Sequence, residues 1–327
     1  MICPSFNRAI NYMVGTHPVG ITSGDFNGDG NLDLAVANNS FVSILLGVGN
    51  GTFLPAMNIN IGDSPLLGIL AADFNGDGKL DLAVTNNAPG NNVSVLLGNG
   101  DGTFQPSTFY PAGDAPIAIT TGDFNGDGKL DLAVTDVDVG ANNVSVLLGN
   151  GDGTFQPPLS FPVGQSPVGI ASADFNGDGK LDLVVANEFS QNISVLLGNG
   201  DGTFQAAVSF EVGQSLEVII AADFNNDGAI DIAVQNYESN NVSVLLNNCF
   251  SSCGQQHSQQ VCYVLQFNIS TQKFSTTITC GSCNQSVTFN PSTGNLTITL
   301  PFTVTYTVTI TNTFELDCNF INVQANF

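Results

Sequence analysis

An acidic loop that recurs five times constrains the fold of this chain more than any other feature of its sequence. The loop reads DFNGDGKLDLAV from Asp73, and close copies begin at Asp25, Asp123, Asp174 and Asp223, at steps of 48 to 51 residues. A repeat of this kind defines the unit of structure and has to be recognised before any local pattern. Each unit is therefore expected to fold in the same way as its neighbours.

Four short runs rich in Val, Ile, Leu, Phe and Thr follow one another in every unit, and Gly, Asn, Asp or Pro bounds each run. Such runs are typical of β-strands, and no segment keeps the 3.6-residue period of an amphipathic helix. Four-stranded units of about 40 to 50 residues have the size of β-propeller blades. The sequence predicts an all-β fold with a five-bladed β-propeller, and a solenoid is the competing interpretation.

The two ends of the repeat region favour a ring over a solenoid. The fifth unit stops after NVSVLLNN, before its fourth strand. Residues 5–15 align with the fourth strand of the second unit at 103–113, which places Phe6 on Phe104 and Tyr12 on Tyr110. An N-terminal strand that completes the last blade would close the ring and remove two exposed sheet edges.

The same alignment places Cys3 beside Cys249 and predicts a disulfide between them. In the chain-entropy model such a long loop corresponds to roughly 4 to 5 kcal/mol of stabilisation, although that model is disputed. Two unrelated surface thiols are the alternative.

The acidic loop has the spacing D-x-N-x-D-G-x-x-D, which provides side-chain oxygens at positions 1, 3, 5 and 9. Hard oxygen donors at alternate positions of a tight loop suit Ca²⁺, which takes six to eight oxygens. Position 7 varies, as expected for a residue that contributes only its backbone carbonyl. The predicted ligands of about five Ca²⁺ ions are Asp25, Asn27, Asp29, Asn31 and Asp33; Asp73, Asn75, Asp77, Lys79 and Asp81; Asp123, Asn125, Asp127, Lys129 and Asp131; Asp174, Asn176, Asp178, Lys180 and Asp182; and Asp223, Asn225, Asp227, Ala229 and Asp231.

Two other interpretations of the loop are weaker. An EF-hand requires a bidentate Glu at position 12 and flanking helices, whereas position 12 here is Val within a strand. A series of metal-free Asx-turns would leave three carboxylates per loop repelling one another. Mg²⁺ prefers to keep its waters and suits a loop with many ligands less well. Calcium would also relieve part of the formal charge of −23.

The units GDAPIAITTGDFNGDGKLDLAV and VSVLLGNGDGTFQ resemble the FG-GAP/VCBS-type repeats of integrin α-subunit heads and of many secreted bacterial proteins. The resemblance covers about residues 5–248. It implies a β-propeller that holds calcium in the loop between strands 1 and 2 of each blade. The family usually has more blades than the five this chain supplies, so an incomplete ring remains an alternative to a small closed one.

The blade topology places the calcium loops and the NGDG turns on one face, and the Asn-rich loops between strands 2 and 3 on the other. By analogy with integrin heads, this opposite face is the expected site for a protein or glycan ligand, or for self-association. Sequons in these loops predict N-glycans at Asn38, Asn92, Asn143, Asn192 and Asn241, unless the sequons result from repeat copying in an Asn-rich chain.

The composition narrows the function. With 28 acidic and 5 basic residues, nucleic acid and anionic membranes are poor partners. No apolar run is long enough to suggest a membrane span. Two histidines and few bases provide no signature of general acid–base or nucleophilic catalysis. The sequence therefore predicts a protein that is not an enzyme.

The repeat ends near residue 249, so the predicted domains are 1–249 for the propeller, 250–260 for a linker and 261–327 for a small β-sandwich of Ig-like type. Thr-rich alternation supports the last assignment, with PSTG as a hairpin turn. Its stability would be helped by disulfides whose pairing is open, among Cys253, Cys262, Cys280, Cys283 and Cys318.

Cysteines and sequons point to an extracellular or cell-surface setting, with an export signal removed. The predicted function is a calcium-stabilised structural or adhesion protein, with the C-terminal strand adding to a neighbour's sheet in a fibril or closing its own sandwich. A carbohydrate-binding module and a polysaccharide-processing enzyme are the alternatives.

Overall fold

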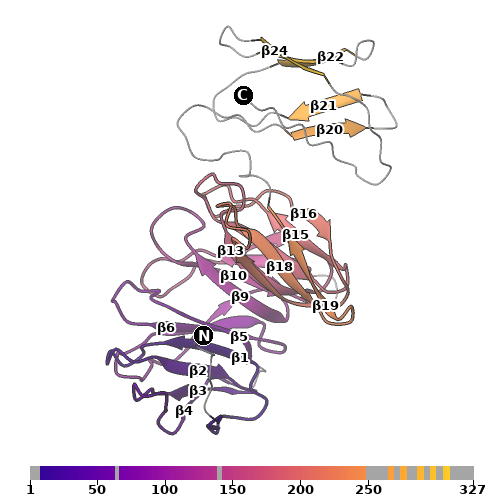
Figure 1. The fold of residues 1–327 in the computed structure, drawn as a ribbon. Coiled ribbons are helices and arrows are strands. Elements are labelled where there is room, and N and C mark those ends of the chain that lie inside the picture. The colour runs from indigo at the N-terminus through magenta and orange to yellow at the C-terminus, as the bar shows by residue number, and fades with distance from the viewer. Residues whose placement is uncertain are drawn as a thin grey trace. The chain divides into compact units, whose positions relative to one another are not determined.

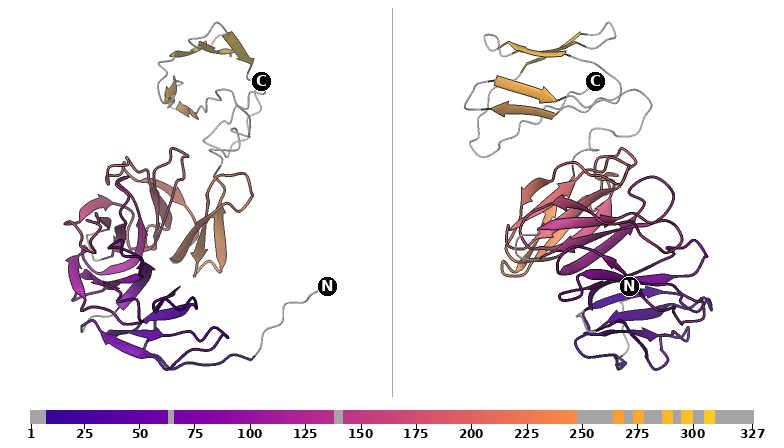
Figure 2. Two further views of the ribbon diagram at one scale, coloured as in Figure 1. Left: turned by 90° about the vertical axis from the view of Figure 1, so that its left-hand side faces the viewer. Right: turned by 180° about the vertical axis from the view of Figure 1, so that it is seen from behind.

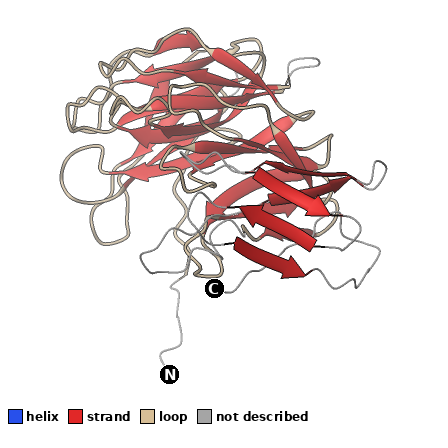
Figure 3. Cartoon of the chain, turned by 90° about the horizontal axis from the view of Figure 1, so that it is seen from above, coloured by secondary structure: helices blue, strands red, loops and turns tan. Residues whose placement is uncertain are grey.

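The computed structural model describes residues 8–62, 66–137 and 142–247, together with the backbone of five further strands between 264 and 309. Every regular element in these residues is a β-strand, as Figures 1 and 3 show. The described residues therefore contain no helix that is long and apolar enough to cross a membrane. The contacts divide the chain into two units, Met1–Asn247 and Asn248–Phe327.

The first unit contains four antiparallel sheets of four strands in sequential order. The first sheet has β1 (Gly20–Gly24), β2 (Asp33–Ala37), β3 (Phe41–Leu45) and β4 (Met57–Asn60). The second has β5 (Leu66–Ala72), β6 (Asp81–Asn86), β7 (Asn92–Leu96) and β8 (Thr108–Pro111). The third has β9 (Pro116–Gly122), β10 (Asp131–Asp136), β11 (Asn143–Leu147) and β12 (Leu159–Pro162). The fourth has β13 (Pro167–Ala173), β14 (Asp182–Asn187), β15 (Asn192–Leu196) and β16 (Val208–Glu211).

A fifth sheet has three strands, β17 (Leu216–Ala222), β18 (Asp231–Asn236) and β19 (Asn241–Leu245). The four-stranded repeat that the sequence predicts is therefore confirmed for four units, and the fifth unit has its first three strands.

The predicted ring is not closed. Within the described part of the chain, residues 8–15 form no strand with β19, and the five sheets follow one another along an open arc (Figure 2). The chain-closing role assigned to residues 5–15 is thus not realised by residues 8–15, and Phe6 lies outside the described residues. Cys3 and Cys249, for which a disulfide is predicted, also lie outside them.

Apolar side chains between neighbouring sheets hold the arc together. All six residues of β6, β10 and β14 are buried, because each of these strands has a neighbouring sheet on both of its faces. We call the side of a sheet that faces the following sheet its trailing face, and the opposite side its leading face.

Four apolar clusters, one between each pair of successive sheets, are built from equivalent positions of the repeat. Between the third and fourth sheets, Phe124, Val144 and Val146 of the trailing face contact Leu183 and Leu196 of the leading face. The other three clusters place equivalent residues in the same roles. The apolar runs of the sequence therefore become strands that are buried between sheets.

The second unit contains two antiparallel groups of strands. One pairs β20 (Val264–Asn268) with β21 (Lys273–Thr277), and the other is formed by β22 (Ser286–Asn290), β23 (Asn295–Thr299) and β24 (Thr305–Thr309). Asn290 pairs with Asn295, as expected for strands joined at the predicted PSTG turn. The cysteines 253, 262, 280, 283 and 318 and the C-terminal strand assigned to fibril formation lie outside the described residues.

Candidate metal centres and loop faces

The first aspartate of each acidic loop organises the loop backbone. The Oδ1 atom of Asp73 accepts hydrogen bonds from the N–H groups of Gly76 at 2.8 Å and Asp77 at 3.2 Å, and its Oδ2 atom accepts one from Gly78 at 2.8 Å. Gly76 and Gly78 have φ angles of 73° and 81°, which L side chains rarely adopt. The two glycines therefore permit the turn that directs three N–H groups at one carboxylate.

Positions 3 and 5 continue the same pattern. Asn75 Oδ1 accepts a hydrogen bond from the N–H of Asp77 at 2.9 Å, and Asp77 Oδ1 accepts one from Lys79 at 3.0 Å. The corresponding bonds recur in the loops that begin at Asp25, Asp123, Asp174 and Asp223. The acidic loop is thus a set of nested Asx-turns in every repeat.

The ninth residue has a structural role that the sequence did not indicate. Asp81 is completely buried. Its Oδ2 atom accepts a hydrogen bond from the N–H of Phe74 at 2.9 Å, and its Oδ1 atom accepts one from Gly98 at 2.7 Å. Because Gly98 follows the third strand, Asp81 ties the acidic loop to the next turn of the same sheet. The only sequence signal for this hydrogen bond was that Asp recurs at the ninth position and that LLG, which ends at Gly98 in this repeat, recurs before the turn.

The buried ninth residue of the loop has a perturbed pKa. Burial raises the pKa of Asp81, hydrogen bonds from Gly98 and Phe74 lower it, and the charges of Asp73 and Asp77 raise it again. Equivalent shifts act on Asp131 and Asp182. The nearby lysine relieves little of this repulsion, because Lys79 Nζ lies 3.7 Å from Asp77 Oδ2 in an exposed pair.

The donor set of each loop fits a hard divalent cation. A carboxylate has about four acceptor positions, and the hydrogen bonds above leave several of them free. In the described residues, no three His, Cys, Asp or Glu side chains already lie close enough to form a metal cluster. Metal binding would therefore require side-chain rotations that bring the oxygens at positions 1, 3 and 5 together, whereas the oxygens at position 9 are already held by backbone donors.

The acidic loops share a face with the NGDG turns, as the predicted topology requires. The N–H of Gly102, in such a turn of the second sheet, donates to the carbonyl of Phe26 in the first acidic loop at 2.9 Å. The same bond joins Gly153 to Phe74 and Gly202 to Phe124. The first three acidic loops are therefore linked to the following sheet as well as to their own.

On the opposite face, a buried asparagine ends the second strand of most sheets. The Nδ2 group of Asn187 donates to Asn192 Oδ1 at 2.8 Å and to Ser194 Oγ at 2.9 Å. Asn86 and Asn236 make the equivalent bonds. The sequon asparagines Asn92, Asn192 and Asn241 thus each accept a hydrogen bond through Oδ1 that helps to fix the loop.

Asn38, for which an N-glycan is predicted, occupies the buried position and not the sequon position of the other repeats. It is completely buried, and its Nδ2 group donates to the carbonyls of Val36 and Phe41 and to Ser43 Oγ. A glycan on this nitrogen would require the strand end to open. The burial of Asn38 argues against the glycan predicted there, and the loop of the first repeat differs in length from the others.

The third sheet has an aspartate where the other sheets have the buried asparagine. Asp136 is 1% exposed, and its Oδ2 atom accepts a hydrogen bond from Ser145 Oγ at 2.7 Å. No described group bonds to its Oδ1 atom. Burial raises the pKa of Asp136 to about 7, the hydrogen bond from Ser145 lowers it, and the charge of Asp114 raises it.

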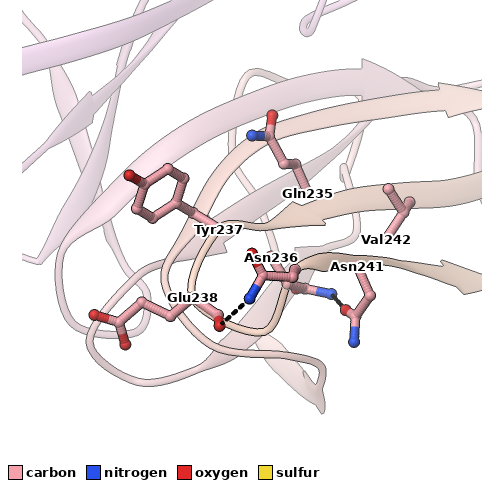
Figure 4. Close-up of a pocket in the computed structure, with 7 residues that line it drawn as sticks. Gln235, Asn236, Tyr237, Glu238, Asn241 and Val242 are labelled. Carbon is pink, nitrogen blue, oxygen red and sulfur yellow. Dashed lines mark hydrogen bonds between the residues drawn. The ribbon is translucent and has the colours of Figure 1, made fainter.

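A hollow of about 630 Å³ lies at the loop between β18 and β19 (Figure 4). Tyr237, which is 64% exposed, and Glu238 project from this loop. The remaining lining consists of Gln235, Asn236, Asn240, Asn241 and Val242. The hollow combines an exposed aromatic ring with amide and carboxylate groups on the face where a ligand is expected.

These features define an all-β protein of repeated four-stranded sheets whose strands 1 and 2 are joined by an acidic Asx-turn loop. Residues 25–84, 73–134, 132–185 and 174–234 match the FG-GAP-like repeat, so the matches span more than half of the 327-residue chain. The chain therefore belongs to the family of proteins with FG-GAP-like repeats, and its sheets follow the propeller-type arrangement. No sequence match is found among curated proteins.

Solved structures with a related arrangement of strands are distant. A lectin from Agrocybe aegerita that recognises non-reducing terminal N-acetylglucosamine shares 22% identity over 72% of this chain and 64% of its own, with a TM-score of 0.48. The match thus spans less than two thirds of that lectin. A functionally unknown protein from Desulfotomaculum acetoxidans shares 14% identity over 91% of this chain and 84% of its own, with a TM-score of 0.49.

A periplasmic gluconolactonase from Pseudomonas aeruginosa shares 16% identity over 70% of this chain and 69% of its own, with a TM-score of 0.49. At these identities and scores, none of the three likenesses carries an argument about function.

Proposed function

We propose that the protein is a non-enzymatic, extracellular or cell-surface binding module whose sheets are stabilised by Ca²⁺ in the acidic loops. The observation that carries this proposal is the arrangement of Asp73, Asn75 and Asp77 around one tight turn, repeated in five loops. Oxygens from carboxylate, amide and backbone groups form the kind of set that Ca²⁺ takes. The bound ion would neutralise the negative charges that each loop brings together.

The ions would act on structure and not on chemistry. Each would hold positions 1, 3 and 5 of a loop whose ninth residue anchors the next turn, and so would fix the acidic-loop face of the sheet. The loops between the second and third strands would remain available to a protein or glycan ligand. We place the adhesive surface there, because on the other face the acidic loops and NGDG turns are bonded to one another.

Calcium binding can be measured directly. Isothermal titration of the chelator-treated protein with Ca²⁺ should show saturable binding of about five ions, and Asp77→Asn together with Asp127→Asn should remove about two of them. The control is Asp152→Asn, because Asp152 lies in an NGDG turn outside the acidic loops and accepts hydrogen bonds from Thr154. Absence of binding, or an equal loss in the control, would contradict the proposal.

Carbohydrate binding is the second candidate, and the hollow at Tyr237 favours it. An exposed aromatic ring can stack on a sugar, while the neighbouring amides and Glu238 can bond hydroxyl groups. Binding to a glycan array should be lost in Tyr237→Ala and retained in Phe189→Ala, which removes an aromatic ring that is 72% exposed on the equivalent loop of the fourth sheet. If no glycan is bound, a protein ligand is the remaining proposal for this face.

A further inference from the structure

The trailing face of the fifth sheet is exposed although it has the composition of a buried one. Val242 and Val244 of β19 are 61% and 54% exposed, whereas their counterparts in β11 are completely buried. Phe224 is 42% exposed, and its counterpart Phe124 is 1% exposed. The fifth sheet therefore presents the surface that in four other places is covered by a following sheet.

The leading face of the first sheet is exposed in the complementary way. Ile21 of β1 is 64% exposed, whereas its counterpart Ile219 in β17 is 6% exposed. Beside it, Leu34 and Leu45 line an apolar hollow of about 400 Å³ together with Ile10. This face has the residues that in the other sheets contact a preceding sheet.

Residues 8–15 lie against the first sheet as a fourth strand lies against the sheet that follows it. The rings of Tyr12 and Phe53 are 5.4 Å apart at 82°, and those of Tyr110 and Phe155 are 5.4 Å apart at 74°. The N–H of Phe53 also donates to Tyr12 Oη at 3.2 Å. This segment is thus in the position of an outer strand, while the fifth sheet has only its first three strands in the described residues.

From these matching ends we propose that the fifth sheet of one copy docks on the first sheet of a second copy, whose residues 8–15 pair with β19. The interface is then a fifth instance of the interface that already joins the sheets four times. Such a contact is heterologous, because two different surfaces of the chain meet, and it can add copies head to tail.

A second copy fits this surface better than the first sheet of the same chain. In the described structure, the first and fifth sheets are not neighbours, whereas each sheet contacts the next one along the chain. The buried clusters between successive sheets fix the step from each sheet to the next. Closure within the chain would change the packing between sheets, whereas docking on a second copy would leave the existing interfaces as they are.

The repeat predicts the register of the new contact. In the second sheet, Val93 pairs with Tyr110 and Ser94 pairs with Phe109. By equivalence, Val242 would lie opposite Tyr12 of the second copy, and Ser243 opposite Asn11. The N–H of Gly51 would donate to the carbonyl of Phe224, as Gly102 donates to Phe26.

Cysteine crosslinking tests both the register and the identity of the occupant. The variants Asn11→Cys and Ser243→Cys are produced separately as full-length chains, mixed and oxidised. We expect a disulfide-linked dimer that joins Cys at 11 of one chain to Cys at 243 of the other, identified by peptide mapping. The wild-type chain gives the background from its native cysteines, and Ser209→Cys in place of Ser243→Cys is the control for the place of the contact, because Ser209 lies in β16 of the fourth sheet.

The double variant Asn11→Cys/Ser243→Cys distinguishes the two occupants. A crosslink only within single chains, with none between the mixed variants, would show ring closure and overturn the proposal. A lack of crosslinking in both experiments, with a monomeric mass at all concentrations, would overturn it as well.

Association provides an independent readout. Sedimentation velocity should show self-association that weakens at least tenfold in Val242→Asp/Val244→Asp, since two carboxylates would be buried without partners. The control Val208→Asp changes a residue of β16 that is 55% exposed and outside the proposed interface. Because the three substituted side chains are exposed, the melting temperature of the monomer should change little. Equal association of the double variant and the control would contradict the proposal.

Discussion

Asp81 Oδ1 accepts a hydrogen bond from the backbone N–H of Gly98 at a distance of 2.7 Å, across 17 residues of sequence. The bond recurs as Asp131 to Gly149 and Asp182 to Gly198. The ninth residue of the acidic loop therefore connects two turns on one face of each sheet. Its contribution to stability can be separated from any contribution to metal binding.

Asp131→Asn should lower the free energy of unfolding by about 2–4 kcal/mol. Asp131 accepts hydrogen bonds from two backbone N–H groups, and in the variant one of these donors would face the N–H₂ group of the amide, which cannot accept a hydrogen bond. Urea unfolding in the presence of EDTA measures this effect without bound metal. The control is Asp127→Asn, which changes an exposed residue of the same loop. Equal losses in the two variants would show that Asp131 has no special structural role.

Removal of calcium should destabilise the repeat unit as a whole. At a free concentration 100 times the dissociation constant, each bound ion contributes about 2.7 kcal/mol, so several sites together should shift the melting temperature strongly. Calorimetry with Ca²⁺, with EDTA and with Mg²⁺ in place of Ca²⁺ checks this expectation. An unchanged melting temperature in EDTA would rule out the assignment of the acidic loops.

Asp136→Asn should stabilise the protein at neutral pH and have little effect at pH 4. The pKa of Asp136 is raised from 3.8 to about 7 in the folded chain, so the unfolded chain loses this proton first as the pH rises. The stability associated with the protonated form is present below about pH 4 and is lost between pH 4 and 7, by up to about 4 kcal/mol.

The matching control for this pH dependence is the reverse change in the fourth sheet. Asn187→Asp places a carboxylate in the equivalent buried position and should introduce a second loss of stability over the same pH range. Denaturant unfolding at constant calcium from pH 4 to 8 provides the comparison. If the free energy of unfolding changed with pH in the same way for wild type and Asp136→Asn, ionisation of Asp136 would not destabilise the folded chain.

Phe124→Ala and Phe224→Ala compare the same repeat position with and without a following sheet. Phe124 is 1% exposed, and truncation should cost about 3–5 kcal/mol through the cavity it leaves. Phe224 is 42% exposed, and its truncation should cost less than about 1 kcal/mol in dilute monomer. Similar costs would mean that a covered fifth sheet already exists in the monomer.

Much of the fold could be predicted from the sequence because local pattern and repeat length agree. Each apolar run is bounded by turn residues, and copies at equivalent positions, such as LDLAV after Asp73 and after Asp123, leave one consistent set of strands. The shared face of the acidic loops and NGDG turns followed from the order of strands alone.

Other features depend on three-dimensional packing and could not be inferred from the pattern. Whether five sheets close a ring depends on the rotation between sheets, which side chains such as Phe124 and Leu183 set by their shapes. The spacing of Asp81 fits a ligand and a structural hydrogen-bond acceptor equally well, and only its burial reveals the second role. Asn38 has the sequence of a sequon but the burial of a core residue.

Among the described residues of the first unit, the main contacts between sheets join sheets that are consecutive in the chain, and this has a consequence for biosynthesis. In a chain of this kind, the first units can fold before the later segments have been synthesised. As the polypeptide leaves the ribosome, every newly completed sheet finds its docking partner already formed, so folding can proceed from the N-terminus at the pace of translation.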